Sequence, residues 1–348
     1  MNYGELYESA MENYMDMRLI SDYRANNEYF DLLDKLASAT FGIALSEWNE
    51  SGLLGSNYIP YSFVADGRIA ANVSANLFSC EIFGQTYQVV QLGTVMTDPA
   101  YRKLGLAGKL MRHVLSVYEK ESLFIFLFAN SSVLEFYPRF GFSRAPQRKY
   151  VFRRSELCPD QRTDQDPDLS AELRTSFRPV YWENEADRKL ISDIAGIRVP
   201  LSDSFGFIGD APFRILFLSD KDNTGKLFYS EALDAVAVVS KEGKTLYIQD
   251  LFCRSGAQGK SRRAYMDRVL SSLPLADVDR IECGFTMDTS YDNVAENLLN
   301  DDADVLFVRS FHPLLMPGGK KIRPFDGANK NRPEINLTGL QISHWDHT

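Results

Sequence analysis

Apolar side chains recur at helical spacing in two segments of the first half of the chain, residues 28–41 and 103–118. Spacing of three and four positions places these side chains on one face, so each segment is predicted to form a helix with one buried side. The predicted buried faces consist of Phe30, Leu33, Leu36 and Ala37 in the first helix and of Leu106, Leu110, Val114 and Val117 in the second.

Strand-like patterns lie between and after these helices. Residues 61–65 and 69–77 flank Asp66-Gly67, a pair that favours the tight turn of a β-hairpin. An unbroken apolar run is typical of a strand covered on both faces, and the run at 123–128 is of this kind. The other predicted elements are a long strand at 87–96, a short helix at 132–137 and a strand at 148–153. This order predicts a mixed α/β (α+β) fold.

The second half of the chain loosely repeats the same order of elements. The predicted elements are strands at 233–239 and 245–252, a helix at 262–273, a strand at 280–285, a helix at 294–299 and a strand at 305–308. Segment lengths and sequence differ between the halves. Duplication of one ancestral unit is therefore a hypothesis at this stage.

A polar, acidic segment with two prolines, residues 156–172, shows neither helical nor strand periodicity and is predicted to be a linker. The length of 348 residues also favours two domains. We therefore expect a first domain at 1–155 and a second at 173–325. Residues 326–348 show no regular period and are predicted to be a tail, which contains Trp345.

Charge varies along the chain more than its formal total of −9 suggests. Residues 1–66 carry 11 acidic and 3 basic side chains, whereas residues 67–155 carry 5 acidic and 12 basic ones. An anionic ligand suits the second stretch, and a cationic substrate suits a surface built from the first, although two solvated faces of opposite sign would give the same pattern. The negative total argues against nucleic acid or an anionic membrane as a partner.

Composition narrows the class of protein further. Hydrophobic residues make up 45% of the chain and charged residues 24%, as in ordinary globular proteins. The sequence has no apolar run long enough to span a membrane and does not begin with a signal-peptide pattern, so a soluble, cytoplasmic protein is expected. Its four cysteines are far apart and form no CxxC pair, so neither a metal site nor a structural disulfide is expected.

The candidate chemistry lies where the predicted strand 87–96 leads into the helix after it. A helix N-terminus offers unpaired backbone N–H groups and partial positive charge, and small first-turn residues let a phosphate approach them. Gly105, Ala107 and Gly108 are small, and Arg102 and Lys103 add charge beside them. The spacing fits neither a P-loop nor a dinucleotide-binding fingerprint. A helix start with incidental glycines remains the alternative.

Two motifs in this region resemble a known family. The spacing Arg102-x-x-Gly105-x-Ala107 after a strand is similar to the pyrophosphate-binding signature of the GNAT N-acetyltransferases. Tyr137-x-x-x-Gly141-Phe142 is similar to a second element of that family, and a helix and an apolar strand stand between the two. The resemblance covers roughly residues 25–155. It implies a mixed, mostly antiparallel sheet with flanking helices.

The whole chain is similar to GNAT acetyltransferases of the enhanced-intracellular-survival type, which have two such units. Residues 256–261 stand where a second pyrophosphate loop would be but lack its spacing, and no second Tyr-x-x-x-Gly-Phe element follows. We therefore expect the second half to be a degenerate GNAT-like domain. In that type the C-terminal carboxylate serves as the base, so the tail from His344 to Thr348 is a candidate for completing the active site.

The resemblance implies acetyl-coenzyme A as co-substrate, with no metal. The strand 87–96 would splay from 123–128, and backbone groups at the end of the first strand would pair with the pantetheine arm, like an added strand. Asn130 would either bond the coenzyme or cap the following helix. The implied coenzyme contacts are Val95, Met96 and Thr97 for the arm, and Arg102, Lys103, Leu104, Gly105, Leu106, Ala107 and Gly108 for the pyrophosphate.

The implied reaction is direct attack of a neutral primary amine on the thioester in a ternary complex. A strand N–H near Val95 could receive the negative charge that develops on the carbonyl oxygen. Tyr137 stands at the family's acid position and would protonate the departing thiolate; the alternative is a core aromatic beside Phe136 and Phe140. The acidic first segment favours a cationic small molecule or peptide as acceptor.

The sequence assigns no general base. Many family members carry a carboxylate on the strand that matches 87–96, but here that strand offers only Gln88 and Gln91. Glu81 could act through water, whereas Glu135 and His113 are better explained by capping and packing. The missing carboxylate also leaves a second function open, a catalytically inactive coenzyme-A-sensing or protein-interaction module. The sequence indicates no oligomeric state.

Overall fold

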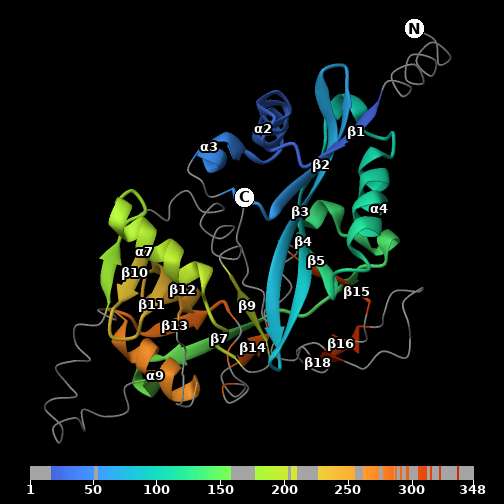
Figure 1. The fold of residues 1–348 in the computed structure, drawn as a ribbon. Coiled ribbons are helices and arrows are strands. Elements are labelled where there is room, and N and C mark those ends of the chain that lie inside the picture. Colours follow the sequence, from blue (N-terminus) through green and yellow to red (C-terminus); the bar gives the residue numbers. More distant parts are fainter. Residues whose placement is uncertain are drawn as a thin grey trace, which may run out of the picture.

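The protein is described here by a computed structural model, shown in Figure 1. It describes residues 17–50, 54–157, 177–202, 205–209, 226–254, 262–273, 277–285, 287, 291, 295–297, 305–311, 314–315, 321–322 and 335–336. Two sheets carry most of these residues. A small third sheet consists of β16 (Leu314–Leu315), β17 (Lys321–Ile322) and β18 (Ile335–Asn336).

The first sheet has the strand order β1-β2-β3-β4-β5-β15-β6, and β9 pairs with β3. Only β4 and β5 are parallel neighbours among its described strands. Its strands are β1 (Arg18–Ser21), β2 (Tyr58–Ala65), β3 (Arg68–Ile82), β4 (Gln85–Thr97), β5 (Phe124–Ala129), β6 (Ser143–Arg144), β9 (Gly206–Ile208) and β15 (Val305–Ser310).

The second sheet has the order β8-β10-β11-β12-β13-β7-β14, and here only β12 and β13 are parallel among the described strands. Each strand thus has a counterpart at the same place in the first sheet, as duplication would predict. The strands are β7 (Arg148–Arg153), β8 (Arg178–Val180), β10 (Leu227–Ser230), β11 (Ala235–Glu242), β12 (Thr245–Cys253), β13 (Arg280–Cys283) and β14 (Ala295–Asn297).

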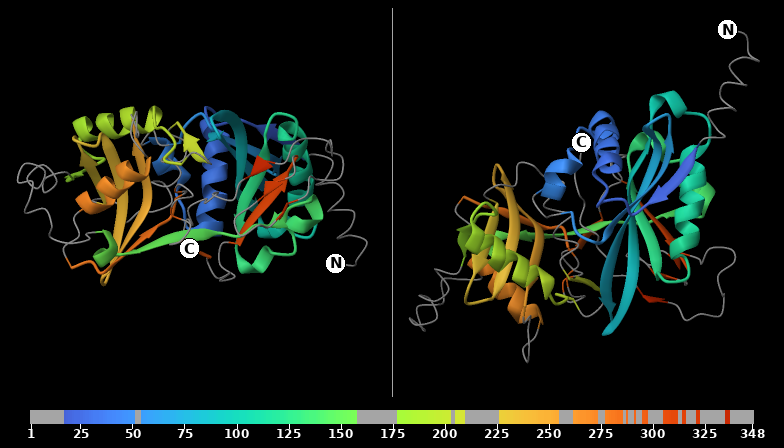
Figure 2. Two further views of the ribbon diagram at one scale, coloured as in Figure 1. Left: turned by 90° about the horizontal axis from the view of Figure 1, so that it is seen from below. Right: turned by 45° about the horizontal axis from the view of Figure 1, so that its top comes forward.

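The two sheets exchange a strand. β7 follows the first sheet in sequence, yet it lies in the second sheet between β13 and β14. β15, from the second half of the chain, lies in the first sheet between β5 and β6. Figure 2 shows β7 in green beside the orange strands of the other half. Both segments are strands, as the sequence predicts, but each lies in the sheet that is formed mostly by the other half of the chain.

Helices cover both faces of the first sheet. α4 (Leu106–Tyr118) packs on one face and α2 (Asn27–Phe41), followed by α3 (Leu45–Glu50), on the other. All four predicted core residues of α2 are buried, and Asn26 and Gly42 cap its two ends. In α4 the predicted stripe is buried except at Val117, which is 39% exposed. The second sheet carries α7 (Glu185–Gly196) and α9 (Arg262–Ser272).

Two predictions of local structure were wrong. The segment 294–299 was predicted to be a helix, but residues 295–297 form β14, because pairing with β7 overrides the helical propensity of a short segment. In place of one helix at 132–137, the chain forms two 3-10 turns, Ser131–Val133 and Tyr137–Phe140. A short α5 (Arg154–Leu157) follows β7. None of the helices described is long and apolar enough to cross a membrane.

Candidate functional site

The central feature of the first sheet is the gap that opens between β4 and β5. These two strands pair only at Val90 with Ile125 and at Gln91 with Phe126. Beyond that point β4 continues to Thr97 and β5 to Ala129 without a ladder between them. The end of β4 therefore presents a free backbone edge among the described residues, as the resemblance implied. An extended ligand can pair with such an edge.

A β-bulge interrupts β4 at this place. The register of the β3–β4 ladder shifts by one residue where Thr94 and Val95 together lie opposite Val73. As a result Leu92 and Val95 both face the core under α4, although simple alternation would put them on opposite faces. Thr94 has a φ of +43°, a left-handed conformation that is rare for a β-branched residue. Of the other predicted contacts in β4, Met96 is buried on the α2 face and Thr97 is half-buried.

Side chains hold the loop after β4 in place. Asp98 donates its backbone N–H to the carbonyl of Ala70 at 3.0 Å, and its Oδ1 accepts from the N–H of Ala100 at 2.8 Å. The hydroxyl of Tyr101 donates to Oδ2 of Asp66 at 2.6 Å, and burial, with this bond, raises the pKa of Tyr101 to about 12. The Asp-Gly turn between β2 and β3 therefore anchors the loop that leads into α4.

The N-terminus of α4 is open. Gly105 is its N-cap residue, with a φ of +74° and no side-chain cap, and a Cβ at this position would meet no atom within 4 Å. Arg102, Lys103 and Leu104 are exposed beside it, and Lys103 also has a positive φ, of +67°. The first turn contains no acidic residue. The first-turn backbone N–H groups, which have no partner within the helix, belong to Leu106, Ala107 and Gly108.

These glycines have different roles in the fold. Gly105 supplies a left-handed backbone at the helix start. At Gly108 a Cβ would lie 3.5 Å from Cζ of Phe140, which is an ordinary contact distance. The side chain of Leu106 is buried in the core beneath α4, so only its backbone faces the open end. With exposed Arg102 and Lys103, this end of α4 suits an anion.

Tyr137 lies in the same buried cluster as Leu92 and Leu106. It is 5% exposed, and its ring packs against Phe136, Phe142 and Phe307 with centroids 5.2, 6.1 and 5.7 Å away. Burial raises the pKa of Tyr137 to about 12, so the hydroxyl stays protonated at neutral pH. Its oxygen has no hydrogen-bond partner among the described residues. Phe307 comes from β15, so the second half of the chain contributes to this environment.

Asn130 caps the short helix that follows β5. Its Oδ1 accepts from the backbone N–H of Ser132 at 3.1 Å and from the hydroxyl of Ser132 at 2.6 Å. Of the two roles left open by the sequence, capping is therefore present in the structure. The side chain is exposed, and a coenzyme contact stays a prediction.

The candidate bases lie in different places. Glu81 pairs with Thr86, eight residues before the bulge, which is roughly 25 Å along the strand. It is therefore too far away to act there through one water. His113 packs its ring on Tyr61 at 5.8 Å, and Glu135 is exposed. The tail that includes His344–Thr348 lies outside the described residues.

A buried polar network beneath the bulge was missed by the sequence analysis. On β3, residues 72, 74 and 76 are polar and alternate with small apolar residues, a pattern typical of a solvent-facing side. In the structure this side is covered by α2, and Asn72 and Ser74 are fully buried. The network consists of Tyr23, Tyr58, Ser62, Asn72, Ser74 and Thr94.

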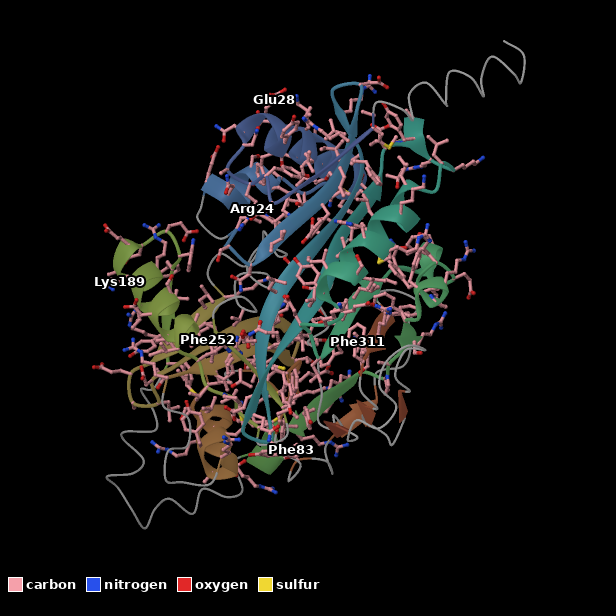
Figure 3. All side chains as sticks on the ribbon, turned by 45° about the vertical axis from the view of Figure 1, so that its right-hand side comes forward. Arg24, Glu28, Phe83, Lys189, Phe252 and Phe311 are labelled. Carbon is pink, nitrogen blue, oxygen red and sulfur yellow. The ribbon has the colours of Figure 1, made fainter. Side chains whose placement is uncertain are left out.

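The corresponding place in the second sheet is occupied by an ion pair. β12 has a bulge at Gln249, and β13 pairs with β12 only as far as Ile248. Directly after this bulge, Asp250 forms two hydrogen bonds with Arg198, of 2.7 and 2.8 Å, and both side chains are nine-tenths buried. The guanidinium also lies over the ring of Phe252, which Figure 3 labels. The predicted second loop, 256–261, lies outside the described residues.

The cysteines of the described part form no disulfide with one another. Cys80, Cys253 and Cys283 are buried, whereas Cys158 lies outside the described residues. Where the structure describes the chain, no three His, Cys, Asp or Glu side chains are grouped so that they could hold a metal ion.

Comparison with known proteins agrees with this geometry. Residues 44–145 match the family model described as an acetyltransferase (GNAT) domain. A stretch of 61 residues is 38% identical to N-alpha-acetyltransferase 50 from Danio rerio. That match covers 16% of this chain and 36% of the relative, so the chain spans about a third of the curated relative's length. The match to the GNAT acetyltransferase domain thus lies within the first half of the chain and includes the bulge in β4 and the start of α4.

Solved structures extend the likeness to both sheets. A conserved protein of unknown function from Enterococcus faecalis V583 matches with a TM-score of 0.51 and 17% identity, over 84% of this chain and 72% of that one. Eis1 from Mycobacterium abscessus matches with a TM-score of 0.51 and 14% identity, over the same shares, 84% and 72%. At this identity the matches establish the fold alone, over most of the chain.

Proposed function

We propose that this protein transfers an acetyl group from acetyl-coenzyme A to a primary amine. The observation that carries the proposal is the free edge of β4, which lies between the bulge and the uncapped N-terminus of α4. A pantetheine arm would pair with Val95 to Thr97, and the pyrophosphate would bind the amides from Arg102 to Gly108. Asn130 would approach the coenzyme from the end of β5.

The proposed chemistry follows from the groups around this gap. The amine attacks the thioester carbonyl, and the N–H of Val95 receives the negative charge on the oxygen. The C–S bond then breaks, and Tyr137 donates its proton to the thiolate. Burial keeps the resting Tyr137 protonated, which supports its role as a donor.

An acidic surface supports a cationic acceptor. The helices α2 and α3 cover the face of the sheet on which the bulge network lies. Their exposed acids are Glu28, Asp31, Glu47 and Glu50, of which Glu28 is labelled in Figure 3. A small cationic amine or a peptide amine is therefore the proposed acceptor class.

We further propose that residues 1–155 and 173–325 are two GNAT-like units, joined by 156–172 and followed by a tail at 326–348. The matching strand order of the two sheets supports this division. The exchange of β7 and β15 means that each unit is completed by a strand from the other.

The test compares Gly105→Asp with Gly105→Asn in calorimetric titrations with acetyl-coenzyme A. Both side chains tolerate the left-handed backbone and have the same shape, so both should cost similar stability. Only aspartate repels the pyrophosphate, by about 1–4 kcal/mol for charges 4 Å apart. Aspartate should therefore bind roughly five- to a thousandfold more weakly than asparagine. Equal affinities would refute the placement of the pyrophosphate.

A further inference from the structure

The bulge in β4 is held by side-chain hydrogen bonds from β3. Nδ2 of Asn72 donates to the backbone carbonyl of Thr94 at 2.8 Å and to Oγ of Ser74 at 2.9 Å. Oδ1 of Asn72 accepts from the hydroxyl of Ser62 at 2.8 Å, and that hydroxyl in turn contacts Tyr23 at 2.6 Å. The side chain of Asn72 is thus fully buried, and both its Nδ2 and its Oδ1 form hydrogen bonds.

The hydroxyl groups of Thr94, Ser74 and Tyr58 form further hydrogen bonds at the bulge. These bonds and those of Asn72 are called the clamp below. Thr94 donates to Ser74 at 2.7 Å, Ser74 donates to Tyr58 at 2.8 Å, and the hydroxyls of Tyr58 and Thr94 lie 3.1 Å apart. Each hydroxyl can therefore donate to the next around a closed ring. Such a fully bonded network fixes the left-handed conformation of Thr94, which is unfavourable for a residue other than glycine.

The bond to the Thr94 carbonyl also sets the direction of the next N–H group. The carbonyl of Thr94 and the N–H of Val95 belong to one peptide, and the chain contains no cis peptide among its described residues. In a trans peptide these two groups point in opposite directions. Since Asn72 on β3 holds the carbonyl, the N–H of Val95 points away from Asn72 and β3. The other neighbour of β4 is β5, from which β4 has parted at this level.

We infer that Asn72 is a positioning residue that aims the N–H of Val95 at the thioester carbonyl oxygen. The inference rests on the proposed function. It goes beyond that function because the orientation of the Val95 N–H is assigned to a buried side chain that contacts neither substrate nor coenzyme. A misdirected N–H would leave the pyrophosphate and most of the arm bound. Loss of the Asn72 side chain should therefore weaken binding of the acetyl group and leave binding of the rest of the coenzyme unchanged.

The experiment compares the affinities of acetyl-coenzyme A and coenzyme A, because only acetyl-coenzyme A has the thioester carbonyl that the N–H of Val95 would contact. In Asn72→Leu the ratio of the two affinities should shift against acetyl-coenzyme A by about 2- to 10-fold, the value of one hydrogen bond, with coenzyme A binding unchanged. Release of coenzyme A during turnover, with spermidine as the amine, should fall by about 10²–10³-fold without a matching rise in KM.

Ser62→Ala is the matched control. It removes a bond from the same buried network but leaves the Nδ2 contact to Thr94 intact, so it should lower the Tm and keep the ratio. If Asn72→Leu does not fold, Asn72→Asp replaces it. Aspartate keeps the shape and the Ser62 bond but replaces the amide donor to Thr94 with an oxygen, and the same shift is expected.

The possible results separate the inference from the proposed function. An unchanged ratio in a folded Asn72 variant that binds coenzyme A would overturn the inference and leave the proposed function standing. An equal shift in Ser62→Ala would also overturn it, because the network as a whole would then be responsible. Failure of the wild-type protein to bind either coenzyme would contradict the proposed function itself.

Discussion

Tyr137→Phe removes the proposed proton donor and keeps the aromatic ring. The ring contacts with Phe136, Phe142 and Phe307 remain, and the hydroxyl has no hydrogen-bond partner among the described residues. The free energy of unfolding should therefore change by no more than about 1 kcal/mol. A lost general acid lowers turnover by roughly 10²–10⁴-fold, which corresponds to about 3–5 kcal/mol of transition-state stabilisation.

The assay measures turnover, acetyl-coenzyme A affinity and Tm on the same two preparations. Turnover should fall by the factor given above while affinity and Tm barely move, since the proton is needed only as the thiolate leaves. A Phe variant with an unimpaired rate would refute the reasoning. Tyr137 would then be a core aromatic residue, and the acid would lie elsewhere.

Alkaline unfolding tests the burial of the same hydroxyl. The unfolded pKa of tyrosine is about 10, and burial raises the pKa of Tyr137 to about 12 in the folded protein. Below pH 10 both states keep the proton. Between pH 10 and 12 only the unfolded state loses it, so the wild type should lose on the order of 3 kcal/mol that Tyr137→Phe does not lose. Parallel losses in both proteins would show that the hydroxyl is not buried.

Three more predictions concern the second half. Each chain should bind one acetyl-coenzyme A, because Arg198 and Asp250 occupy the place after the second bulge; two similar sites in a calorimetric titration would refute this. Asp250→Ala should lower stability by about 3–5 kcal/mol, by leaving Arg198 buried without its partner, yet keep coenzyme affinity. Residues 1–155 expressed alone should aggregate, because β5 and β6 lose β15 between them, and co-expressed 156–348 should restore a complex in size-exclusion chromatography. A folded, monomeric 1–155 would contradict the role of the exchanged strand.

Local patterns in the sequence located most elements of the first half. The helical stripe of α2 and the Asp66-Gly67 turn were predicted with their core residues and position, because each depends on neighbours in the chain. Gly105 was predicted at an open helix N-terminus for the same reason: its spacing from Arg102 and Ala107 is a local property. The loop and Tyr137 were also named from the sequence as candidate site residues, and their roles stay predictions.

The clamp around Thr94 could not be found in this way. Asn72 and Ser74 alternate with apolar residues, and that alternation reports two faces of a strand without telling which face a helix will cover. The bulge is also invisible in the pattern, because it depends on the register of β3 against β4. Only the packing of α2 over these residues converts a polar face into a buried network.

The sequence by itself determined that β7 and β15 are strands, that small residues stand at the start of α4, and that the first half carries two motifs similar to those of the GNAT family. The tertiary structure decided which sheet each strand completes. Backbone hydrogen bonds between strands are the same for almost any residue, so an apolar segment such as 305–308 specifies burial without specifying its partner. Whether β15 pairs with β5 or with β13 depends on how both sheets assemble. Its pairing with β5 places Phe307, from the second half of the chain, beside Tyr137 of the first.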